Sequence, residues 1–516
     1  MVSRRITVGV AAVLLAVGAA AVMNAGSAGP AIRTAALNGP PGDIAVDPVS
    51  GRAFIVLSQA DSLSQTGSVN RFIAVVDTRT GALLRTLDPG VDEQNLELDP
   101  RTHRLVVSGN GRAALLDTRR GIVVYATGAA LPASSVALDL LHGHTIVVGD
   151  GFPNPGNGLY LTVLDSRTGR PLHKVRLNSD QPIGNSLAVD DAAGRIVVAS
   201  TSLVVVKTSD PSVSNINALE RVTTLDLSGR VIRTVVVGQL NGPTSNGVSI
   251  VPDQRRRRAL VLDPDTSTVS VLDERTGALI RAISLAPRRP TRRAMIYNSY
   301  LEAWAVDESS GHLFVATPPP RVTCSTSRGC NPVGPGSLDT FDTQIGRLLH
   351  TTAVPDARSI AVDPHAGRVL ISSNSISGNS NTGMSLSILD AHSGRLLRTI
   401  GPSAAPWGQW GSDPVVDAGA DRAYVCGDNG LLSVLDTHDG RVIRTLPLGG
   451  QYDHLALDEQ AHRIVLVGEA SAPAPADPWG WMPGWLRSRI AAIPPPPHPP
   501  ATAAPPSGIV ATLDIP

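Results

Sequence analysis

The stretch IAVDPHAGRVLISS (residues 360–373), followed by SLSILDAHSGRLLRTI (residues 385–400), decides the fold of this 516-residue chain. It consists of a short apolar run ending in Asp, a turn and a second run. A third run ending in Asp, a further turn and a run containing Arg-Thr complete it. The same pattern recurs nine times along the chain, at intervals of about 40 to 60 residues. Repetition on this scale indicates an array of identical supersecondary units.

Each repeat contains four short runs rich in Val, Ile and Leu, a length and composition that predict strands. The DPxxGR and DxxTG motifs between them are typical of tight turns, because Asp and Thr bond nearby backbone and Gly accepts positive φ. Four antiparallel strands repeated radially predict an all-β fold, a β-propeller. Nine repeats exceed the usual four to eight blades, so we expect eight or nine blades. Two separate rings are the alternative, although no Pro/Ser linker divides the repeats.

The two ends of the chain predict how the ring closes. The ninth repeat stops after its third run, IVATLDI (residues 509–515), and no Arg-Thr run follows it. Residues 31–37 (AIRTAAL) resemble that missing run. We therefore expect the N-terminal strand to complete the last blade, which removes an open sheet edge. The prediction is a single closed propeller over residues 31–516.

The repeat resembles that of the YVTN (YncE-like) β-propeller family. The resemblance rests on SIAVDPHAGRVLIS (residues 359–372), LSVLDTHDG (residues 432–440) and VIRTLPLGG (residues 442–450). It covers nearly all of residues 31–516. The resemblance implies a WD40-like repeat fold and an extracytoplasmic setting. Relatives include the large subunits of some quinoprotein amine dehydrogenases.

The N-terminus and the cysteines also favour a location outside the cytoplasm. In residues 1–28, Arg4 and Arg5 precede an apolar run over residues 6–23, and small residues follow. This pattern predicts a signal peptide or, alternatively, a retained membrane anchor. Cys324 and Cys330 flank a short loop and predict a local disulfide. The protein is therefore expected to be secreted, on the cell surface or periplasmic.

We expect function on the face that carries the long, individual loops, because the opposite face carries the short, repeated turns. One residue before each innermost strand should lie at the mouth of the central channel. Those predicted to bind a ligand are Asp43, Asn95, Asn185, Asn246, Arg358, Asp413 and His454. Such a set of carboxylates, amides, Arg and His could orient a polar ligand. The alternative is that these side chains only solvate the channel.

The most individual segment is the Trp- and Pro-rich insertion at residues 470–507 in the last blade. It contains Trp479, Trp481 and Trp485. Exposed Trp side chains near Arg predict contact with a partner or a membrane interface. A flap packed on the propeller, with a stiff Pro-rich return, is the alternative.

The sequence contains no GxSxG, HExxH or CxxC motif, and Asp263-Pro264-Asp265 is interpreted as a hairpin turn rather than a calcium loop. Lys plus Arg equals Asp plus Glu at 44 each, which argues against nucleic-acid binding. The preferred hypothesis is a non-catalytic protein, without cofactor or metal, that binds a protein or cell-envelope ligand. The alternative is an enzyme. It would be a metal-dependent lactonase-like hydrolase using Asp43, Asp413 and His454, or a propeller subunit of a quinoprotein amine dehydrogenase-like system.

Overall fold

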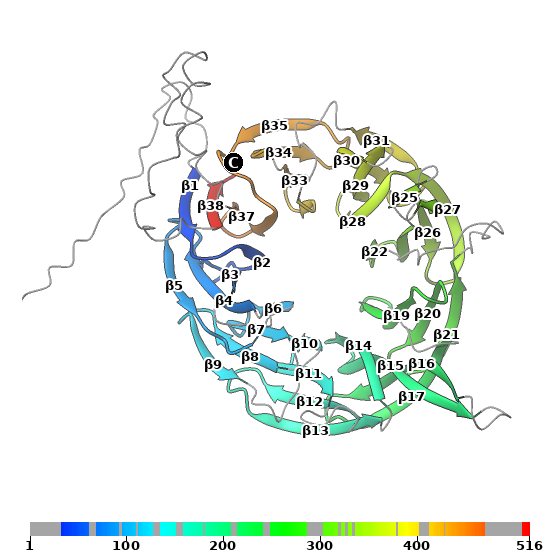
Figure 1. Cartoon of the computed structure of the whole chain (residues 1–516). Helices are drawn as coiled ribbons and strands as arrows, with labels where there is room; N and C mark the ends of the chain where they lie inside the picture. The colour runs from blue at the N-terminus through cyan, green and yellow to red at the C-terminus, as the bar shows by residue number, and fades with distance from the viewer. Residues whose placement is uncertain are drawn as a thin grey trace, which may run out of the picture.

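The chain folds into a single ring of nine four-stranded antiparallel sheets, as the computed structural model in Figure 1 shows. The structure describes residues 32–60, 69–91, 95–109, 112–126, 135–150, 158–178, 181–207, 214–240, 248–285, 303–317, 321–325, 329–332, 336–377, 380–401, 412–427, 429–469 and 508–515. The predicted all-β propeller is confirmed, with nine blades rather than eight and one ring rather than two. The described residues include no helix long and apolar enough to cross a membrane. Residues 1–28, the predicted signal peptide or anchor, lie outside the described residues.

The blades follow one another along the chain, each running from its innermost to its outermost strand. Blades 1 to 3 consist of β2 (Pro41–Asp47), β3 (Arg52–Ala60), β4 (Val69–Asp77) and β5 (Leu83–Leu87); β6 (Asn95–Asp99), β7 (Arg104–Gly109), β8 (Arg112–Asp117) and β9 (Ile122–Ala126); and β10 (Ser135–Asp139), β11 (His144–Asp150), β12 (Leu159–Asp165) and β13 (Pro171–Asn178). Blades 4 to 6 consist of β14 (Gln181–Asp190), β15 (Arg195–Lys207), β16 (Ser214–Asp226) and β17 (Val231–Leu240); β18 (Ser249–Asp253), β19 (Arg258–Asp263), β20 (Thr268–Asp273) and β21 (Leu279–Ser284); and β22 (Ala303–Asp307), β23 (His312–Thr317), β26 (Gly336–Asp342) and β27 (Arg347–Val354). Blades 7 to 9 consist of β28 (Asp356–Asp363), β29 (Arg368–Ser377), β30 (Ser380–Asp390) and β31 (Leu396–Ile400); β32 (Val415–Asp417), β33 (Arg422–Cys426), β34 (Leu431–Asp436) and β35 (Val442–Pro447); and β36 (His454–Asp458), β37 (Arg463–Glu469), β38 (Gly508–Asp514) and β1 (Ile32–Leu37).

The N-terminal strand closes the ring, as predicted. β1 pairs antiparallel with β38, in a register that runs from Ile32 opposite Leu513 to Leu37 opposite Gly508. Figure 1 shows the first and last described strands side by side in this blade, β1 in blue and β38 in red. The last blade thereby obtains the fourth strand that its own repeat lacks.

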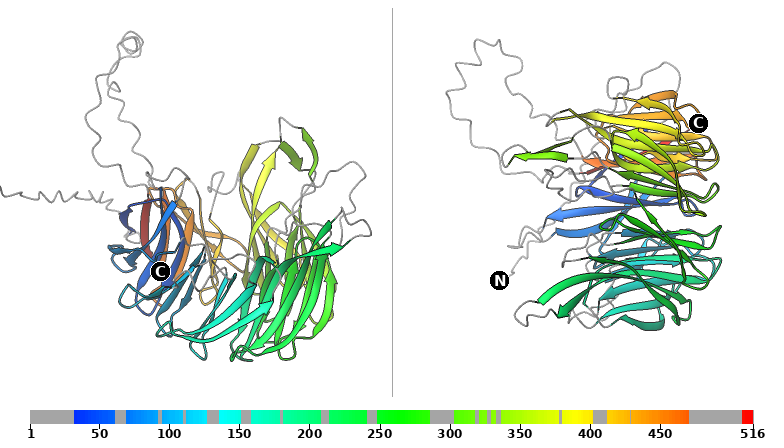
Figure 2. Two further views of the ribbon diagram at one scale, coloured as in Figure 1. Left: turned by 60° about the horizontal axis from the view of Figure 1, so that its bottom comes forward. Right: turned by 90° about the vertical axis from the view of Figure 1, so that its right-hand side faces the viewer.

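In blades 4 and 7 the connection between the two middle strands is formed by extensions of the strands themselves. β15 and β16 pair over their full length as far as Lys207 opposite Ser214, and β29 pairs with β30 as far as Ser377 opposite Ser380. In the first case the run LVVVK (residues 203–207) continues the strand, because β-branched residues favour extended backbone. Both hairpins extend beyond the ring on one side (Figure 2).

The core lies between neighbouring blades, where aliphatic side chains of the two middle strands meet. Between blades 8 and 9, for example, Tyr424, Leu432 and Leu466 are fully buried in one cluster. Burying one such Leu stabilises the fold by roughly 1.5–3 kcal/mol. The low aromatic content is therefore compensated by many Val, Ile and Leu contacts.

Residues that recur at the same position of several repeats make polar contacts between blades. The Arg that begins the second strand of a blade donates to a backbone carbonyl in the next blade. Arg52, of the motif DPVSGR, donates from Nη1 to the oxygen of Thr118 at 3.0 Å, and Arg258, at the same position in DQRRRR, donates from Nη1 to that of Thr343 at 3.0 Å. The hydroxyl of Thr118 in turn donates to the buried carboxylate of Asp47 in blade 1. The turn motifs therefore hold neighbouring blades together as well as shaping hairpins.

The Gly of the DxxTG motif lies against the outermost strand of the preceding blade. Gly169 has φ +72°, and a Cβ added there would lie 2.4 Å from the Cβ of Tyr125. At Gly394, in the related turn DAHSG and with φ +64°, an added Cβ would lie 2.6 Å from that of His350. Gly is required for two reasons at these turns, the left-handed backbone and the close approach of the preceding blade.

Candidate functional site

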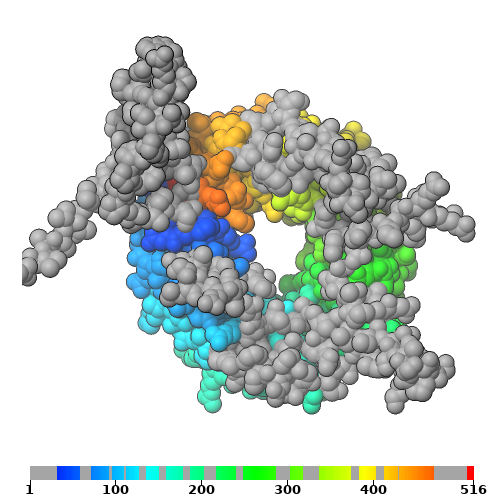
Figure 3. Space-filling model, viewed as in Figure 1, coloured from blue at the N-terminus to red at the C-terminus, as the bar shows by residue number. Residues whose placement is uncertain are grey.

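A polar pocket of about 520 Å³ opens at the mouth of the central channel. Nine residues from blades 1, 2, 7, 8 and 9 line it: Asp43, Ile44, Leu96, Arg358, Asp413, Val415, Asp453, His454 and Leu455. Figure 3 shows blades 1, 7, 8 and 9 bordering the central opening, in blue, yellow-green and orange. The pocket therefore lies on both sides of the place where the ring closes, between blade 9 and blade 1.

Four of the seven residues predicted at the channel mouth line this one pocket: Asp43, Arg358, Asp413 and His454. Sequence reasoning missed Asp453, because it took one residue per blade and chose the adjacent His454 in blade 9. Whether these side chains bind a ligand stays a prediction.

The other predicted residues lie elsewhere or outside the described part of the chain. Asn95 and Asn185 lie in β6 and β14, but their side chains are outside the described residues. Asn246, Trp479, Trp481 and Trp485 also lie outside them, as does the whole insertion at residues 470–507. The predicted contact of these Trp residues with a partner or membrane therefore stays a prediction.

Irregular pairing places two of the charged residues in the pocket. The register between β2 and β3 shifts between Pro41 and Ile44, and that between β28 and β29 shifts between Ala357 and Ser359. Gly42 and Asp43 lie at the first of these shifts, and Arg358 lies at the second. Such bulges redirect side chains and are frequent beside binding sites.

Two hydrogen bonds to the backbone of Cys426 fix the position of Asp413 through its neighbour Ser412. The neighbouring Ser412 donates its N–H to the carbonyl oxygen of Cys426 at 2.8 Å, and its Oγ accepts the N–H of Cys426 at 3.0 Å. Cys426 is fully buried, and burial together with the nearby charge of Asp453 raises the pKa of its thiol to about 12. The backbone of Cys426, through Ser412, therefore supports this side of the pocket.

A tight turn fixes Asp453 and His454. Tyr452 is fully buried, and the N–H of Asp453 donates to the carbonyl oxygen of Val467 at 2.9 Å. A Cβ on Gly468 would lie 2.0 Å from the carbonyl oxygen of Gln451 and 2.6 Å from the Cα of Tyr452, so only Gly leaves room for this turn. Tyr452 points into the core while Asp453 stays exposed at the pocket.

The donor set does not favour a metal in this pocket. Within the described part of the chain, the three acidic, His or Cys side chains whose ligand atoms all lie within 4.8 Å of one another are Glu220, Asp263 and Asp265. Asp43, Asp413 and His454 form no such group there. Single-metal sites need ligand atoms about 2 to 2.5 Å from the ion. The geometry therefore gives no support to the metal-dependent hydrolase.

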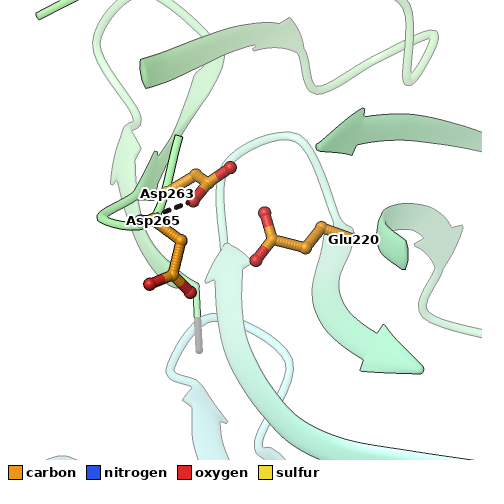
Figure 4. A group of neighbouring side chains, drawn as sticks. All are labelled: Glu220, Asp263 and Asp265. Carbon is orange, nitrogen blue, oxygen red and sulfur yellow. Dashed lines mark hydrogen bonds between the residues drawn. The ribbon is translucent and has the colours of Figure 1, made fainter. Parts of the chain in front are cut away.

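The acidic group of Glu220, Asp263 and Asp265 lies between blades 4 and 5 (Figure 4). Asp263 Oδ1 accepts the N–H groups of Asp265 and Thr266, each at 2.9 Å, and the Thr266 hydroxyl donates to Oδ2. These bonds shape the turn between β19 and β20, so the predicted hairpin turn is confirmed. Glu220 was not anticipated beside it, because it comes from the neighbouring blade.

Cys324 and Cys330 lie in a small hairpin between blade 6 strands. They are directly opposite each other in the pairing of β24 (Arg321–Ser325) with β25 (Gly329–Pro332). Directly opposite residues of antiparallel strands have Cα atoms about 4.5 to 5.5 Å apart, which a disulfide can span. Their side chains lie outside the described residues, so the disulfide stays a prediction.

The fold and its pocket define a nine-bladed β-propeller with a charged channel mouth. A protein-family profile described as outer membrane protein assembly factor BamB matches residues 42–270, somewhat less than half of the chain. The match shows that these residues are similar to the repeats of that family. The narrower YVTN-like assignment stays a prediction.

Several solved structures resemble the fold at low sequence identity. They include a eukaryotic initiation factor (11% identity, TM-score 0.49, 81% of this chain and 90% of that chain covered) and BamB from Moraxella catarrhalis (14%, 0.42, 83% and 95%). A third is the quinohemoprotein alcohol dehydrogenase ADHIIG from Pseudomonas putida HK5 (12%, 0.47, 94% and 76%). No curated protein sequence matches the chain.

Proposed function

We propose that this protein is an extracytoplasmic, YVTN-like β-propeller that binds a ligand through its loop face without catalysing a reaction. The observation that carries the proposal is the pocket itself, which charged side chains from blades 1, 7, 8 and 9 line together with apolar residues. A few polar groups set on an apolar wall are typical of binding sites.

The setting outside the cytoplasm is supported by three features. They are the apolar run over residues 6–23, the opposed Cys324 and Cys330, and the match to a family described as an outer-membrane assembly factor. Proteins of that description act in the cell envelope, which agrees with a protein or cell-envelope ligand for this chain.

The proposal is tested by ligand-dependent thermal unfolding of the exported protein. The probes are a panel of amino acids, sugars, nucleotides and short peptides. A ligand of the pocket raises the melting temperature of the wild type and loses this effect in Asp413→Asn. Glu459→Gln is the control, because Glu459 is an exposed carboxylate in the turn after β36, at the opposite end of that strand from the pocket. A shift that both variants keep, or no shift with any probe, would contradict the proposal.

A further inference from the structure

We propose that the ligand of this pocket carries an organic cation, an alkylammonium or guanidinium group, together with an anionic group several bonds away. This inference rests on the proposed function, and it names the chemical class of the ligand. It follows from the number, order and surroundings of the charges around the pocket.

Three carboxylates, those of Asp43, Asp413 and Asp453, face the pocket and are exposed. Within the described part of the chain, these three groups take part in no hydrogen bond or ion pair. Each stands where the chain enters an innermost strand, in blades 1, 8 and 9, which are consecutive around the closed ring. Carboxylates gathered in one concavity repel each other and favour a cation between them.

A positive charge stands beside this series of three carboxylates, at the blade 8 end. Arg358 belongs to blade 7, next to the blade of Asp413, and is exposed at the pocket. The order around the mouth is therefore Arg358, Asp413, Asp453 and Asp43. A ligand with charges of both signs can match this order, with its anionic end at Arg358 and its cationic end toward Asp43.

The wall of the pocket also contains apolar residues. Ile44, Leu96, Val415 and Leu455 line the same pocket as the charged groups. A methylene chain fits such a wall, whereas a small inorganic ion would leave it bare. The volume of about 520 Å³ lies within the range usual for small organic ligands. Free lysine or arginine, and a peptide that ends in either residue, share this chemistry.

The test uses calorimetric titration of the full-length exported protein with matched probes. They are 6-aminohexanoate, which carries both charges, pentylamine, which carries the cation, and hexanoate, which carries the anion. A Lys-containing tripeptide distinguishes a peptide from a free amino acid, and calcium chloride tests for a metal. We expect 6-aminohexanoate to bind at least tenfold more tightly than pentylamine, and hexanoate not to bind.

The variants separate the two ends of the site. Asp453→Asn and Asp43→Asn should each weaken 6-aminohexanoate and pentylamine about tenfold. Arg358→Gln should weaken 6-aminohexanoate to the affinity of pentylamine and leave pentylamine unchanged. Glu459→Gln should alter neither. Melting temperatures without ligand show whether each variant is folded, and the Arg358 variant tests the proposal even if one Asp variant is not.

The outcomes separate this inference from the proposed function. Binding of neutral or anionic probes that depends on Asp413, with no amine bound, would overturn the ligand class and retain the binding pocket. Calcium binding without amine binding would overturn it in favour of a metal site. No response to any polar probe, here or in the wider panel, would overturn both.

Discussion

The hydroxyl of Thr78 in blade 1 donates a hydrogen bond of 3.4 Å to a carboxylate oxygen of Asp458 in blade 9, across 380 positions of sequence. The same contact joins Thr118 of blade 2 to Asp47 of blade 1, where the two are only 71 positions apart. Blades 9 and 1, where the ring closes, are therefore joined by the same Thr–Asp hydrogen bond that joins blades 1 and 2. Ring closure follows from the repeat itself, once β1 has supplied the missing outer strand.

Thr118→Val should destabilise the protein by about 1–3 kcal/mol, because it removes a donor from a buried carboxylate. Asp47 is fully buried, and although burial alone would raise its pKa, the hydrogen bonds from Thr118 and the turn hold the pKa below its ordinary value. A carboxyl with a lowered native pKa contributes stability above its unfolded pKa of 3.8 and loses it as pH falls. Urea unfolding at pH 7 should show the deficit, which should shrink toward pH 3.

Thr437→Val is the matched control for this substitution. Thr437 occupies the same position in blade 8 and is equally buried, but its hydroxyl has no hydrogen-bond partner among the described residues. We expect its replacement to be close to neutral. Equal losses in the two variants would show that the hydroxyl bond between blades does not matter.

The fold was predictable because the repeat recurs along the whole sequence, whereas the site was predictable only in part. Strand runs and turn motifs identified the blades, and the Arg-Thr run identified β1. Position in the repeat also identified Asp43 and Arg358 at the channel mouth, but not the bulges in β2 and β28 at which they lie, because bulges arise from strand pairing. Asp453 depends on how Tyr452 packs against Gly468. No pattern of residue types in the sequence predicts such contacts.

Gly169→Ala should cost more stability than Gly143→Ala, although both residues belong to blade 3 and have nearly equal φ of +72° and +73°. The cost of a left-handed Ala, about 1 kcal/mol, is common to both variants. Only at Gly169 does the added Cβ meet the neighbouring blade, whereas nothing lies within 4 Å at Gly143. We expect an excess of about 1–3 kcal/mol in chemical denaturation. Equal costs would mean that the blades can separate slightly without penalty.

Alkylation of the protein purified without reductant should label one cysteine under denaturing, non-reducing conditions and all 3 after reduction. Cys324 and Cys330, opposed in their hairpin, should be joined, and the fully buried Cys426 should be free. Without denaturant, Cys426 should resist labelling, because burial raises the pKa of its thiol to about 12. Labelling of all three without reductant would contradict the disulfide. Cys324→Ser, which should release one further thiol, is the control.

Between blades 4 and 5, Glu274 replaces the Thr whose hydroxyl bonds an Asp of the neighbouring blade elsewhere in the ring. It follows Asp273 at the position that Thr78 and Thr118 occupy in their blades, and it is fully buried. The corresponding inner residue of the preceding blade is Asp190, also fully buried. Burial, followed by the neighbouring Asp190 carboxyl, raises the pKa of Glu274 to about 10. A carboxyl therefore stands where the repeat elsewhere places a hydroxyl donor.

Glu274→Gln should make the protein more stable at pH 8 to 9 and leave it little changed near pH 4. In the unfolded chain the Glu274 carboxyl loses its proton near 4.5, and in the fold only near 10. Between these values the folded state binds more protons, so the wild type loses stability as pH rises, and the variant does not. Melting temperatures measured from pH 4 to 9 should diverge by several degrees. Glu274→Thr, which restores the hydroxyl, should behave like the Gln variant, while the exposed Glu459→Gln should follow the wild type. A constant difference across this range would show that Glu274 is ionised in the folded protein.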